Sequence, residues 1–457
     1  MALSIVILAA GQGTRMLSHR PKVLHELAGR PLLQHVYDAA SALAPARVVV
    51  VYGHGGELVR QRCSQLKAHW VEQPQQLGSG HAVRQALPQI PEQDLVLVLC
   101  GDVPLITAAT LERLIAAAGD SGFGLLTVTL DNPSGYGRIL RDEHRKVIGI
   151  VEERDATSEQ RMIKEINTGL MAVSAGWLRE WLGRVGNDNA QGEYYLTDIV
   201  AVAVTDGHSV STVSPDSEAE VRGVNDRAQL AELESHFRAR QARSLMLQGL
   251  ALIDPARFDY RGELTFGTDC VVDINVILEG AVRFGNGVRV GANTVIRDSE
   301  LGDDVVILPN CIIEDSSIGR GSQLGPFARL RPETTLHEDV RIGNFVEIKK
   351  SDIAGGTKIN HLSYVGDTQV GKNVNIGAGT IVCNYDGANK HRTVIGDGVF
   401  VGSDTQLVAP VLVGEGATIG AGTTVTKDIP PGVLAISRTT QTTIPSWKRP
   451  QKKKPHR

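Results

Sequence analysis

A glycine-rich segment directly after an apolar run contains the first residues that suggest chemistry. It reads Leu8-Ala9-Ala10-Gly11-Gln12-Gly13-Thr14-Arg15-Met16, and Lys22 follows it. Glycines let backbone N–H groups approach phosphate oxygens, and Arg15 and Lys22 add fixed positive charges. A Rossmann dinucleotide fingerprint would have a third glycine where Met16 stands, and the Gly-Lys-Ser/Thr of a Walker loop is missing. A Gly-x-Gly after a strand is a weak signal by itself, but the segment indicates a phosphate-binding loop.

A carboxylate follows a second apolar run, in the tripeptide Cys100-Gly101-Asp102. If residues 95–100 form a parallel strand, Asp102 lies at the carboxyl edge of the sheet, where α/β sheets bind their ligands. A carboxylate in that place suits Mg²⁺, which keeps several waters and bridges phosphates. An Asp at a strand end is more often a cap or turn residue, so the magnesium interpretation depends on the neighbouring motifs.

A second polar group lies in the C-terminal half of the chain, close to an insertion at 383–390. Its members are Arg331, Lys349, His361, Tyr364 and Asn375. Arg331 and Lys349 are separated by about one coil of a repeat, which would stack the two cations along one edge. Each residue alone is more readily explained as part of a solvated face. An extended loop on a regular solenoid is nevertheless a usual place for a site, and the insertion therefore favours a functional interpretation.

The elements that would position the first group alternate between strands and helices. The apolar runs 3–8, 47–52 and 95–100 are typical of buried parallel strands, and 32–43 has a helical pattern. This order predicts an α/β, Rossmann-like domain over residues 1–225. Apolar residues at roughly helical spacing then predict a linker helix over 226–248.

The second group lies on a six-residue repeat. Apolar residues recur at every sixth position from Phe266 to Val425, with four breaks that are one residue short and one, from Val382 to Ile395, that is longer. Groups of three such positions define nine coils, and every break falls between two groups. Length variation confined to one corner is expected of a triangular coil. The spacing therefore predicts a parallel β-helix of hexapeptide repeats over 249–457, but it does not determine the hand.

Composition excludes several classes of function. The net charge is −4, whereas a nucleic-acid-binding protein usually has a basic surplus. No apolar run reaches the ~18 residues of a membrane span, and the N-terminal run lacks the basic region of a signal peptide. The five cysteines are scattered and form no Cys-x-x-Cys pair, which favours a reducing compartment. We expect a cytoplasmic enzyme with small-molecule substrates, no nucleic acid and no membrane span.

Several motifs together resemble a known family. The segment from Leu8 to Lys22 resembles the signature of sugar-phosphate nucleotidyltransferases, and the segments 73–80, 135–138, 165–169 and 223–225 resemble their base-, sugar- and metal-binding segments. With the hexapeptide repeats included, the whole chain apart from its basic tail resembles the bifunctional bacterial N-acetylglucosamine-1-phosphate uridyltransferase/glucosamine-1-phosphate acetyltransferase family. Resemblance to hexapeptide-repeat proteins also implies that the β-helix is left-handed.

For the nucleotidyltransferase domain, this resemblance implies transfer of UMP from UTP to N-acetylglucosamine-1-phosphate. Arg15 and Lys22 would be catalytic, Gln73, Gly78 and Ser79 would bind uridine, Gly137, Glu152 and Asn167 would bind the amino sugar, and Asp102 with Asn225 would bind Mg²⁺. The complete set implied for UDP-N-acetylglucosamine is Leu8, Ala9, Ala10, Gly11, Lys22, Gln73, Gly78, Ser79, Cys100, Gly101, Asp102, Gly137, Glu152, Asn167 and Asn225. Cys100 stands where the family more often has Tyr, and Ser79 where it more often has Thr.

For the β-helix, the resemblance implies transfer of an acetyl group from acetyl-CoA to glucosamine-1-phosphate. His361 would be the general base, and Arg331, Lys349, Tyr364 and Asn375 would bind the sugar phosphate. The acetyl-CoA set is Ala378, Asn384, Tyr385, Ser403, Ala421 and Arg438, with Asn384 and Tyr385 near the reacting groups. Acetyl-CoA clefts in this family lie between subunits, so a homotrimer is implied.

Two alternatives to this bifunctional enzyme remain open. One is a single-activity nucleotidyltransferase whose β-helix regulates or oligomerises it, and the other is a non-catalytic scaffold. The basic tail after Arg438 contains Lys448, Arg449, Lys452, Lys453, Lys454 and Arg457. A solvated, disordered end is its favoured interpretation, and contact with a phosphorylated ligand is the alternative.

Overall fold

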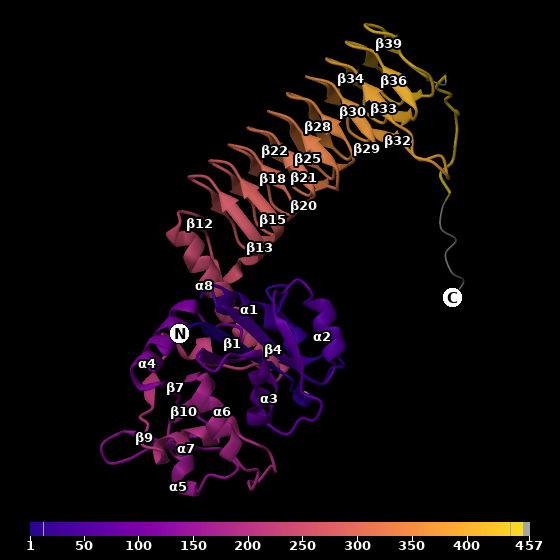
Figure 1. Ribbon diagram of the computed structural model, residues 1–457. Helices are drawn as coiled ribbons and strands as arrows, with labels where there is room; N and C mark the ends of the chain where they lie inside the picture. The colour runs from indigo at the N-terminus through magenta and orange to yellow at the C-terminus, as the bar shows by residue number, and fades with distance from the viewer. Residues whose placement is uncertain (12, 439, 451–457) are drawn as a thin grey trace, which may run out of the picture. The chain divides into compact units, whose positions relative to one another are not determined.

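The structure is a computed structural model that describes residues 1–11, 13–438 and 440–450. The chain forms two compact units, Met1–Arg238 and Ala239–Arg457 (Figure 1). Helix α8, Arg227–Leu247, contains the division between them, in the region where we expected a linker helix. The functional limits 1–225 and 249–457 remain predictions. Gln12 of the glycine-rich segment and Lys452, Lys453, Lys454 and Arg457 of the basic tail lie outside the described residues.

A nine-stranded sheet forms the centre of the first unit, with the strand order β11-β7-β10-β6-β1-β4-β5, with β8 beside β10 and with β9 beside β8. The bounds are β1 Leu3–Ala9, β4 Arg47–Tyr52, β5 His69–Glu72, β6 Leu95–Cys100, β7 Phe123–Thr129, β8 Arg138–Arg141, β9 Val147–Val151, β10 Glu165–Ser174 and β11 Ser211–Val213; β2 Glu26–Leu27 and β3 Arg30–Pro31 form a separate hairpin. Strand β1 pairs in parallel with β4 and β6. The predicted α/β sheet is therefore confirmed, with β10 inserted antiparallel between β6 and β7.

Helices cover both faces of this sheet. Their bounds are α1 Leu32–Ser41, α2 Gly56–Arg62, α3 Ser79–Ala86, α4 Ala108–Ser121, α5 Ser158–Arg161, α6 Ala175–Arg184 and α7 Ile199–Thr205. Ile5 and Ile7 of β1 pack in one buried cluster with residues of α1 and α4, whereas Val6 packs on the other face with residues of α3, α6 and α7. Because both faces of β1 are buried, the strand is apolar at successive positions instead of at alternate ones.

The second unit is a parallel β-helix, as predicted. One sheet consists of β12 Ala251–Leu252, β14 Val271–Val272, β16 Arg289–Val290, β19 Val306–Ile307, β22 Gln323–Leu324, β25 Arg341–Asn344, β28 Lys358–His361, β31 Asn375–Ile376, β34 Phe400–Val401, β37 Thr418–Ile419 and β39 Leu434–Ala435. The strands of the other two faces are β13 Asp259–Phe266, β15 Ile277–Phe284, β17 Val295–Arg297, β18 Glu300–Leu301, β20 Ile312–Glu314, β21 Ser316–Ile318, β23 Arg329–Leu330, β24 Thr334–Leu336, β26 Glu347–Lys349, β27 Asp352–Ile353, β29 Tyr364–Gly366, β30 Thr368–Val370, β32 Ile381–Cys383, β33 Thr393–Ile395, β35 Gln406–Val408, β36 Val411–Val413 and β38 Thr424–Val425.

The six-residue repeat points inward along this solenoid. Every predicted repeat position except the half-buried Phe266 belongs to one buried cluster that extends through the second unit. Neighbouring coils are in register, for example Leu278 with Ile296 and Ile296 with Ile313. Val370 pairs with Ile395, so the longer break is a loop that leaves one corner and returns without shifting the stack. Figure 1 shows the successive coils as parallel strands. The hand of the helix stays an expectation from the resemblance.

The inward-facing repeat positions predict that two adjacent residues contribute differently to the free energy of unfolding. Ile313 has 0% of its surface exposed, whereas its neighbour Ile312 is 42% exposed. We expect Ile313→Ala to lower the free energy of unfolding by about 2–5 kcal/mol, because truncation leaves a cavity that the stacked coils cannot close. Ile312→Ala is the matched control and should cost about 1 kcal/mol or less. Urea unfolding followed by circular dichroism measures both changes, and equal effects would contradict the assignment of the inward face.

Candidate active sites

A cavity of about 540 Å³ opens at the carboxyl ends of β1 and β6. Ten residues of the predicted UDP-N-acetylglucosamine set line it: Leu8, Ala9, Ala10, Gly11, Lys22, Gln73, Gly78, Ser79, Cys100 and Asp102. The strands end side by side because they are parallel, and the N–H of Gly101 donates to Leu8 O at 2.9 Å. A Cβ on Gly101 would lie 3.0 Å from Leu8 O, so the close approach of the two strand ends favours glycine there.

Lys22 connects the two oxygens expected to hold a metal ion. Its Nζ forms an ion pair with the Asp102 carboxylate and donates to Asn225 Oδ1 at 3.3 Å. The N–H of Val224 donates to Asp102 O at 2.9 Å, which places Asn225 beside the strand end although it is distant in the sequence. A cation therefore already bridges this oxygen pair. One carboxylate and one amide oxygen fit Mg²⁺, which takes oxygen ligands and completes its shell with water and phosphate.

Arg15 lies apart from this cavity. It belongs to a 3₁₀ helix, Thr14–Met16, in which Met16 is buried and Arg15 is exposed. Arg15 does not line the cavity and forms no hydrogen bond or ion pair with another residue of the described segments. Its guanidinium is free to reach an incoming anion.

The three residues predicted for the amino sugar lie together. Asn167 N donates to Gly137 O at 2.9 Å, and a Cβ on Gly137 would lie 3.3 Å from both carboxylate oxygens of Glu152. A Cβ on Gly169 would lie 3.1 Å from Cys100 Sγ, so Cys100 links this group to the cavity. Burial raises the pKa of the Cys100 thiol to about 12, and the thiol remains protonated at neutral pH.

Glu152 is a buried carboxyl group. Burial raises its pKa above the ordinary value, and the hydroxyl of Thr197, which donates to Glu152 Oε1 at 3.0 Å, partly opposes this shift. The neighbouring Asp198 also has a raised pKa because of burial. An ionised Glu152 can accept hydrogen bonds from sugar hydroxyl groups, whereas the protonated form presents one acceptor fewer.

The loop predicted to bind uridine is fixed by backbone contacts. Gly78 has a φ of 104°, and a Cβ there would lie 2.6 Å from Tyr194 O, so both conformation and space favour glycine. Ser79 Oγ accepts a hydrogen bond from Leu196 N at 3.0 Å, and its hydroxyl is therefore part of the local structure. Glu193, which precedes this contact segment, lines the cavity as well.

His361 lies at the end of β28 in the second unit, and its side chain is exposed. Its Nδ1 is 2.8 Å from Asn344 Oδ1, and Asn344 is its register partner on β25. An amide oxygen can only accept, so the contact requires the proton on Nδ1. Nε2 of the neutral ring then carries a lone pair, as a general base requires.

Cations gather on a neighbouring edge of the β-helix. Arg331 Nη1 pairs with Glu347 Oε1 at 3.0 Å. The ammonium of Lys390, from the 383–390 loop, lowers the pKa of Lys349, as do burial and Arg331, whereas the carboxylate of Asp367 opposes the shift. Like charges held close together destabilise the protonated form unless an anion compensates them, so the cluster suits a phosphate group.

The insertion begins with a buried amide. Asn384 Nδ2 donates to the Asp367 carboxylate and lies 3.5 Å from the Tyr364 hydroxyl. Tyr385, the next residue, is 59% exposed. The structure therefore brings Tyr364 and Asn384 together and leaves the Tyr385 ring at the surface.

Four of the residues predicted for acetyl-CoA, Ala378, Ser403, Ala421 and Arg438, lie in one column that begins at His361, whereas Asn384 and Tyr385 belong to the 383–390 loop. The strands β28, β31, β34 and β37 pair through Ile359, Ile376, Val401 and Ile419, and His361, Ala378, Ser403 and Ala421 each follow the paired residue by two positions. Asp404 N donates to Ala378 O, Gly422 N donates to Ser403 O, and Arg438 Nε donates to Ala421 O at 3.2 Å. Asn375 begins β31, paired with Lys358, and its side chain forms no hydrogen bond with the other predicted substrate residues in the described chain.

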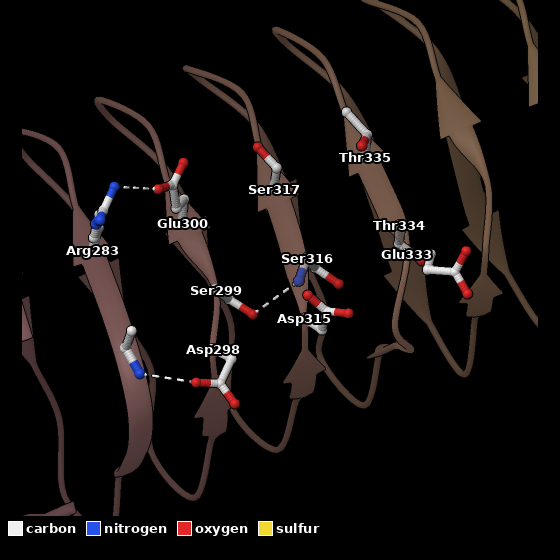
Figure 2. A pocket seen from close by; sticks show the side chains of 11 residues that line it. Arg283, Asp298, Ser299, Glu300, Asp315, Ser316, Ser317, Glu333, Thr334 and Thr335 are labelled. Atoms are coloured by element: carbon white, nitrogen blue, oxygen red, sulfur yellow. Dashed lines mark hydrogen bonds and ion pairs between the residues drawn. The ribbon is translucent and has the colours of Figure 1, made fainter. Parts of the chain in front are cut away.

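Figure 2 shows a further groove of about 550 Å³ on the β-helix. Its walls carry hydroxyl groups and carboxylates, among them Asp298, Asp315 and Glu333. Arg283 pairs with Glu300 at 2.8 Å, and Ser316 N donates to Ser299 Oγ at 3.1 Å. None of the predicted site residues lines this groove.

Several residues that lie at these sites were not among the predicted site residues, although the predicted segments 8–16, 73–80 and 383–390 contain three of them. They are Thr14, Gln76 and Glu193 in the first unit and Asn344 and Lys390 in the second. Asn344 could have been found from the repeat, because it precedes His361 by one coil. Glu193 has no comparable signal, since its segment is brought to the cavity by contacts with Leu77, Ser79 and Gly80, which are distant in the sequence.

The fold and the two sites define a nucleotidyltransferase unit joined to a hexapeptide-type transferase unit. Family models agree: residues 5–168 match the MobA-like NTP transferase domain, and 392–427 match the bacterial transferase hexapeptide (six repeats). No helix in the described segments is long and apolar enough to cross a membrane.

Relatives match nearly the whole chain, and each bears the name bifunctional protein GlmU. One from Methylococcus capsulatus is 56% identical over 453 residues, covering 99% of this chain and 98% of its own. One from an Azoarcus species is 58% identical over 452 residues, covering 99% and 100%, and one from Aromatoleum aromaticum is 56% identical over 452 residues, covering 99% and 99%. The chain belongs to the family of the bifunctional protein GlmU. The prediction of a bifunctional enzyme, a uridylyltransferase and glucosamine-1-phosphate acetyltransferase, is thereby confirmed.

The raised pKa of Glu152 generates a prediction about acidic pH. Protonation should remove an acceptor for the sugar, so affinity is lost as pH falls through a pKa that lies above that of an ordinary glutamate. We expect the Kd of UDP-N-acetylglucosamine, measured by calorimetry, to rise on acidification. Glu152→Gln, which keeps one acceptor and does not titrate, should bind more weakly at neutral pH and lose most of that rise. Glu143 is exposed, and Glu143→Gln is therefore the control. If Kd rose with falling pH as steeply in Glu152→Gln as in the unaltered protein, the assignment of Glu152 to the sugar would be contradicted.

Proposed function

We propose that the chain acetylates glucosamine-1-phosphate with acetyl-CoA on its β-helix and then transfers UMP from UTP to the product in its first unit. The products of the second reaction are UDP-N-acetylglucosamine and pyrophosphate. The observation that carries this proposal is that each compact unit gathers its own predicted set: Lys22, Asp102 and Asn225 in one, and His361 with the Ala378–Ser403–Ala421 column in the other. The uridyl-transfer site and the acetyl-transfer site are thus separate.

In uridylyl transfer, the sugar-phosphate oxygen attacks the α-phosphorus of UTP in line with the leaving pyrophosphate. Such a reaction needs positioning and charge neutralisation more than a covalent catalyst. Lys22 lies at the cavity wall to neutralise phosphate charge, and the exposed Arg15 can approach the same phosphates. Asp102 and Asn225 would hold Mg²⁺, which would supply further neutralisation of the triphosphate. Glycines of the 11–13 segment let backbone N–H groups approach the anion.

In acetyl transfer, the cations Arg331, Lys349 and Lys390 hold the phosphate of glucosamine-1-phosphate. The sugar amine nitrogen attacks the thioester carbonyl carbon, the bond from that carbon to sulfur breaks, and the CoA thiolate leaves. His361 Nε2 takes the proton that the amine loses and can return it to the thiolate. Asn344 keeps the other ring proton on Nδ1 and so maintains Nε2 as the base. Tyr364 and Asn384 bind near the amine, and Asn375 would bind the sugar from its place on β31.

The assembly that we propose is a homotrimer in the cytoplasm, with the acetyl-CoA cleft between neighbouring left-handed β-helices. An exposed apolar stack beside the base supports a covering subunit. Phe327, Phe345 and Leu362 are 49%, 56% and 59% exposed, and the two rings stack with centroids 5.2 Å apart. Phe345 and Leu362 directly follow Asn344 and His361 in the sequence. Exposed apolar groups of this kind are usual at interfaces.

His361 provides the test that separates the two activities. We expect His361→Ala to lower acetyl transfer by about 10²–10⁴-fold, the contribution typical of a general base, and to leave uridylyl transfer within about twofold. Asn344→Ala should lower acetyl transfer less, because the ring loses its tautomer preference but keeps the base. CoA release and pyrophosphate release measure the two reactions in one preparation. If His361→Ala retained both activities equally, the proposal that the β-helix carries out acetyl transfer would be contradicted.

Product analysis complements these variants. The purified protein is given glucosamine-1-phosphate, acetyl-CoA, UTP and Mg²⁺, with each component omitted in turn. We expect CoA, pyrophosphate and UDP-N-acetylglucosamine together, and no pyrophosphate without acetyl-CoA, because the acetylated sugar is the second substrate. Pyrophosphate formed only from added N-acetylglucosamine-1-phosphate, with no CoA released, would indicate a single-activity nucleotidyltransferase.

A further inference from the structure

Three side chains form a hydrogen-bonded chain behind the cavity of the first unit. Gln73 is 3% exposed and lines the cavity; its Nε2 lies 3.1 Å from Gly78 O and 3.0 Å from His81 Nδ1. On the far side of the imidazole, Gln85 Nε2 lies 3.1 Å from His81 Nε2 and donates to His81 O at 3.4 Å. His81 and Gln85 are four residues apart on α3 and therefore face the same side of that helix.

The Gly78 carbonyl determines which way the Gln73 amide points. A carbonyl oxygen can only accept, so the Gln73 atom beside it must be the NH₂ group; the opposite rotamer would place two acceptors 3.1 Å apart. One amide hydrogen then donates to Gly78 O, and the other points at His81 Nδ1. Gly78 cannot turn its carbonyl away, because its left-handed backbone is packed against Tyr194.

The second hydrogen of Gln73 determines the state of His81. Nδ1 must accept, so the ring proton lies on Nε2. The Gln85 amide has its NH₂ toward this nitrogen and must turn to present its oxygen, which gives up its 3.4 Å contact with His81 O. Both hydrogens of Gln73 are thereby used on the protein. Its Oε1 accepts no hydrogen bond from the described residues and is the remaining polar atom available to a ligand.

We propose that His81 is a positioning residue that makes the enzyme selective for uracil over cytosine, by holding Gln73 with its oxygen toward the base. This inference rests on the proposed uridylyl transfer and on Gln73 as the residue that meets the base. Position 3 of uracil is an N–H donor, which an amide oxygen accepts. Cytosine has an unprotonated nitrogen there, and an oxygen held against it is repelled. Without His81, the Gln73 amide is held only by the Gly78 carbonyl. It can then turn and present its NH₂ group to cytosine.

The experiment compares UTP and CTP as substrates of the full-length protein with N-acetylglucosamine-1-phosphate. His81→Leu removes the acceptor, whereas His81→Asn places an amide oxygen near the position of Nδ1. We expect His81→Leu to reduce the ratio of kcat/KM for UTP to that for CTP by about tenfold or more, mainly through the KM for UTP. His81→Asn should restore most of the ratio. Acetyl transfer, measured in the same preparations, checks that the chain is folded.

Two results would overturn the inference. One is an unchanged UTP-to-CTP ratio in His81→Leu, and the other is an equal loss of selectivity in His81→Leu and His81→Asn, which would indicate general disruption of the loop. Failure of the proposed function looks different: the unaltered protein would then release no pyrophosphate from UTP, or Gln73→Ala would leave the KM for UTP unchanged.

Discussion

Parallel strand pairing with a fixed register is the constraint on which both sites depend. In the first unit it brings the carboxyl ends of β1 and β6 to one edge, so the glycine-rich segment and Cys100-Gly101-Asp102 lie side by side. In the second unit the same pairing stacks residues that are one coil apart, which places Asn344 beside His361. In the β-helix, buried aliphatic residues hold this register, because a shift by one residue would turn the apolar positions toward water.

Charge is arranged differently at the two sites. In the first unit Lys22 is already paired with Asp102, so the metal ion and triphosphate that we propose for this site would redistribute an existing ion pair. In the β-helix, the contact between the like-charged Lys349 and Lys390 lowers the pKa of Lys349, although the carboxylate of Asp367 opposes part of this shift. An incoming phosphate relieves that repulsion, which favours binding of an anionic sugar over a neutral one.

Hydrogen-bond donors and acceptors at both sites are directed by neighbouring groups of the protein. Asn344 sets the tautomer of His361, and the Gly78 carbonyl sets the rotamer of Gln73, which in turn sets His81. In each case a group that can only accept removes one of two possible proton arrangements. The choice of donor or acceptor atom that His361 and Gln73 present is therefore made by the protein groups that contact these two side chains.

The sequence by itself determined the strands at 47–52 and 95–100, the inward six-residue column, and the loop at the corner after Val382. These follow from local apolar spacing, which burial enforces wherever the fold is built. The motifs also predicted most residues of the first cavity. Only the tertiary structure decided that Glu193 reaches that cavity, that Arg15 stands outside it and that Lys390 meets Lys349, because these placements depend on loop paths and rotamers. The orientation of Gln73 belongs with them, since it arises from contacts among three side chains and one carbonyl that no spacing in the sequence encodes.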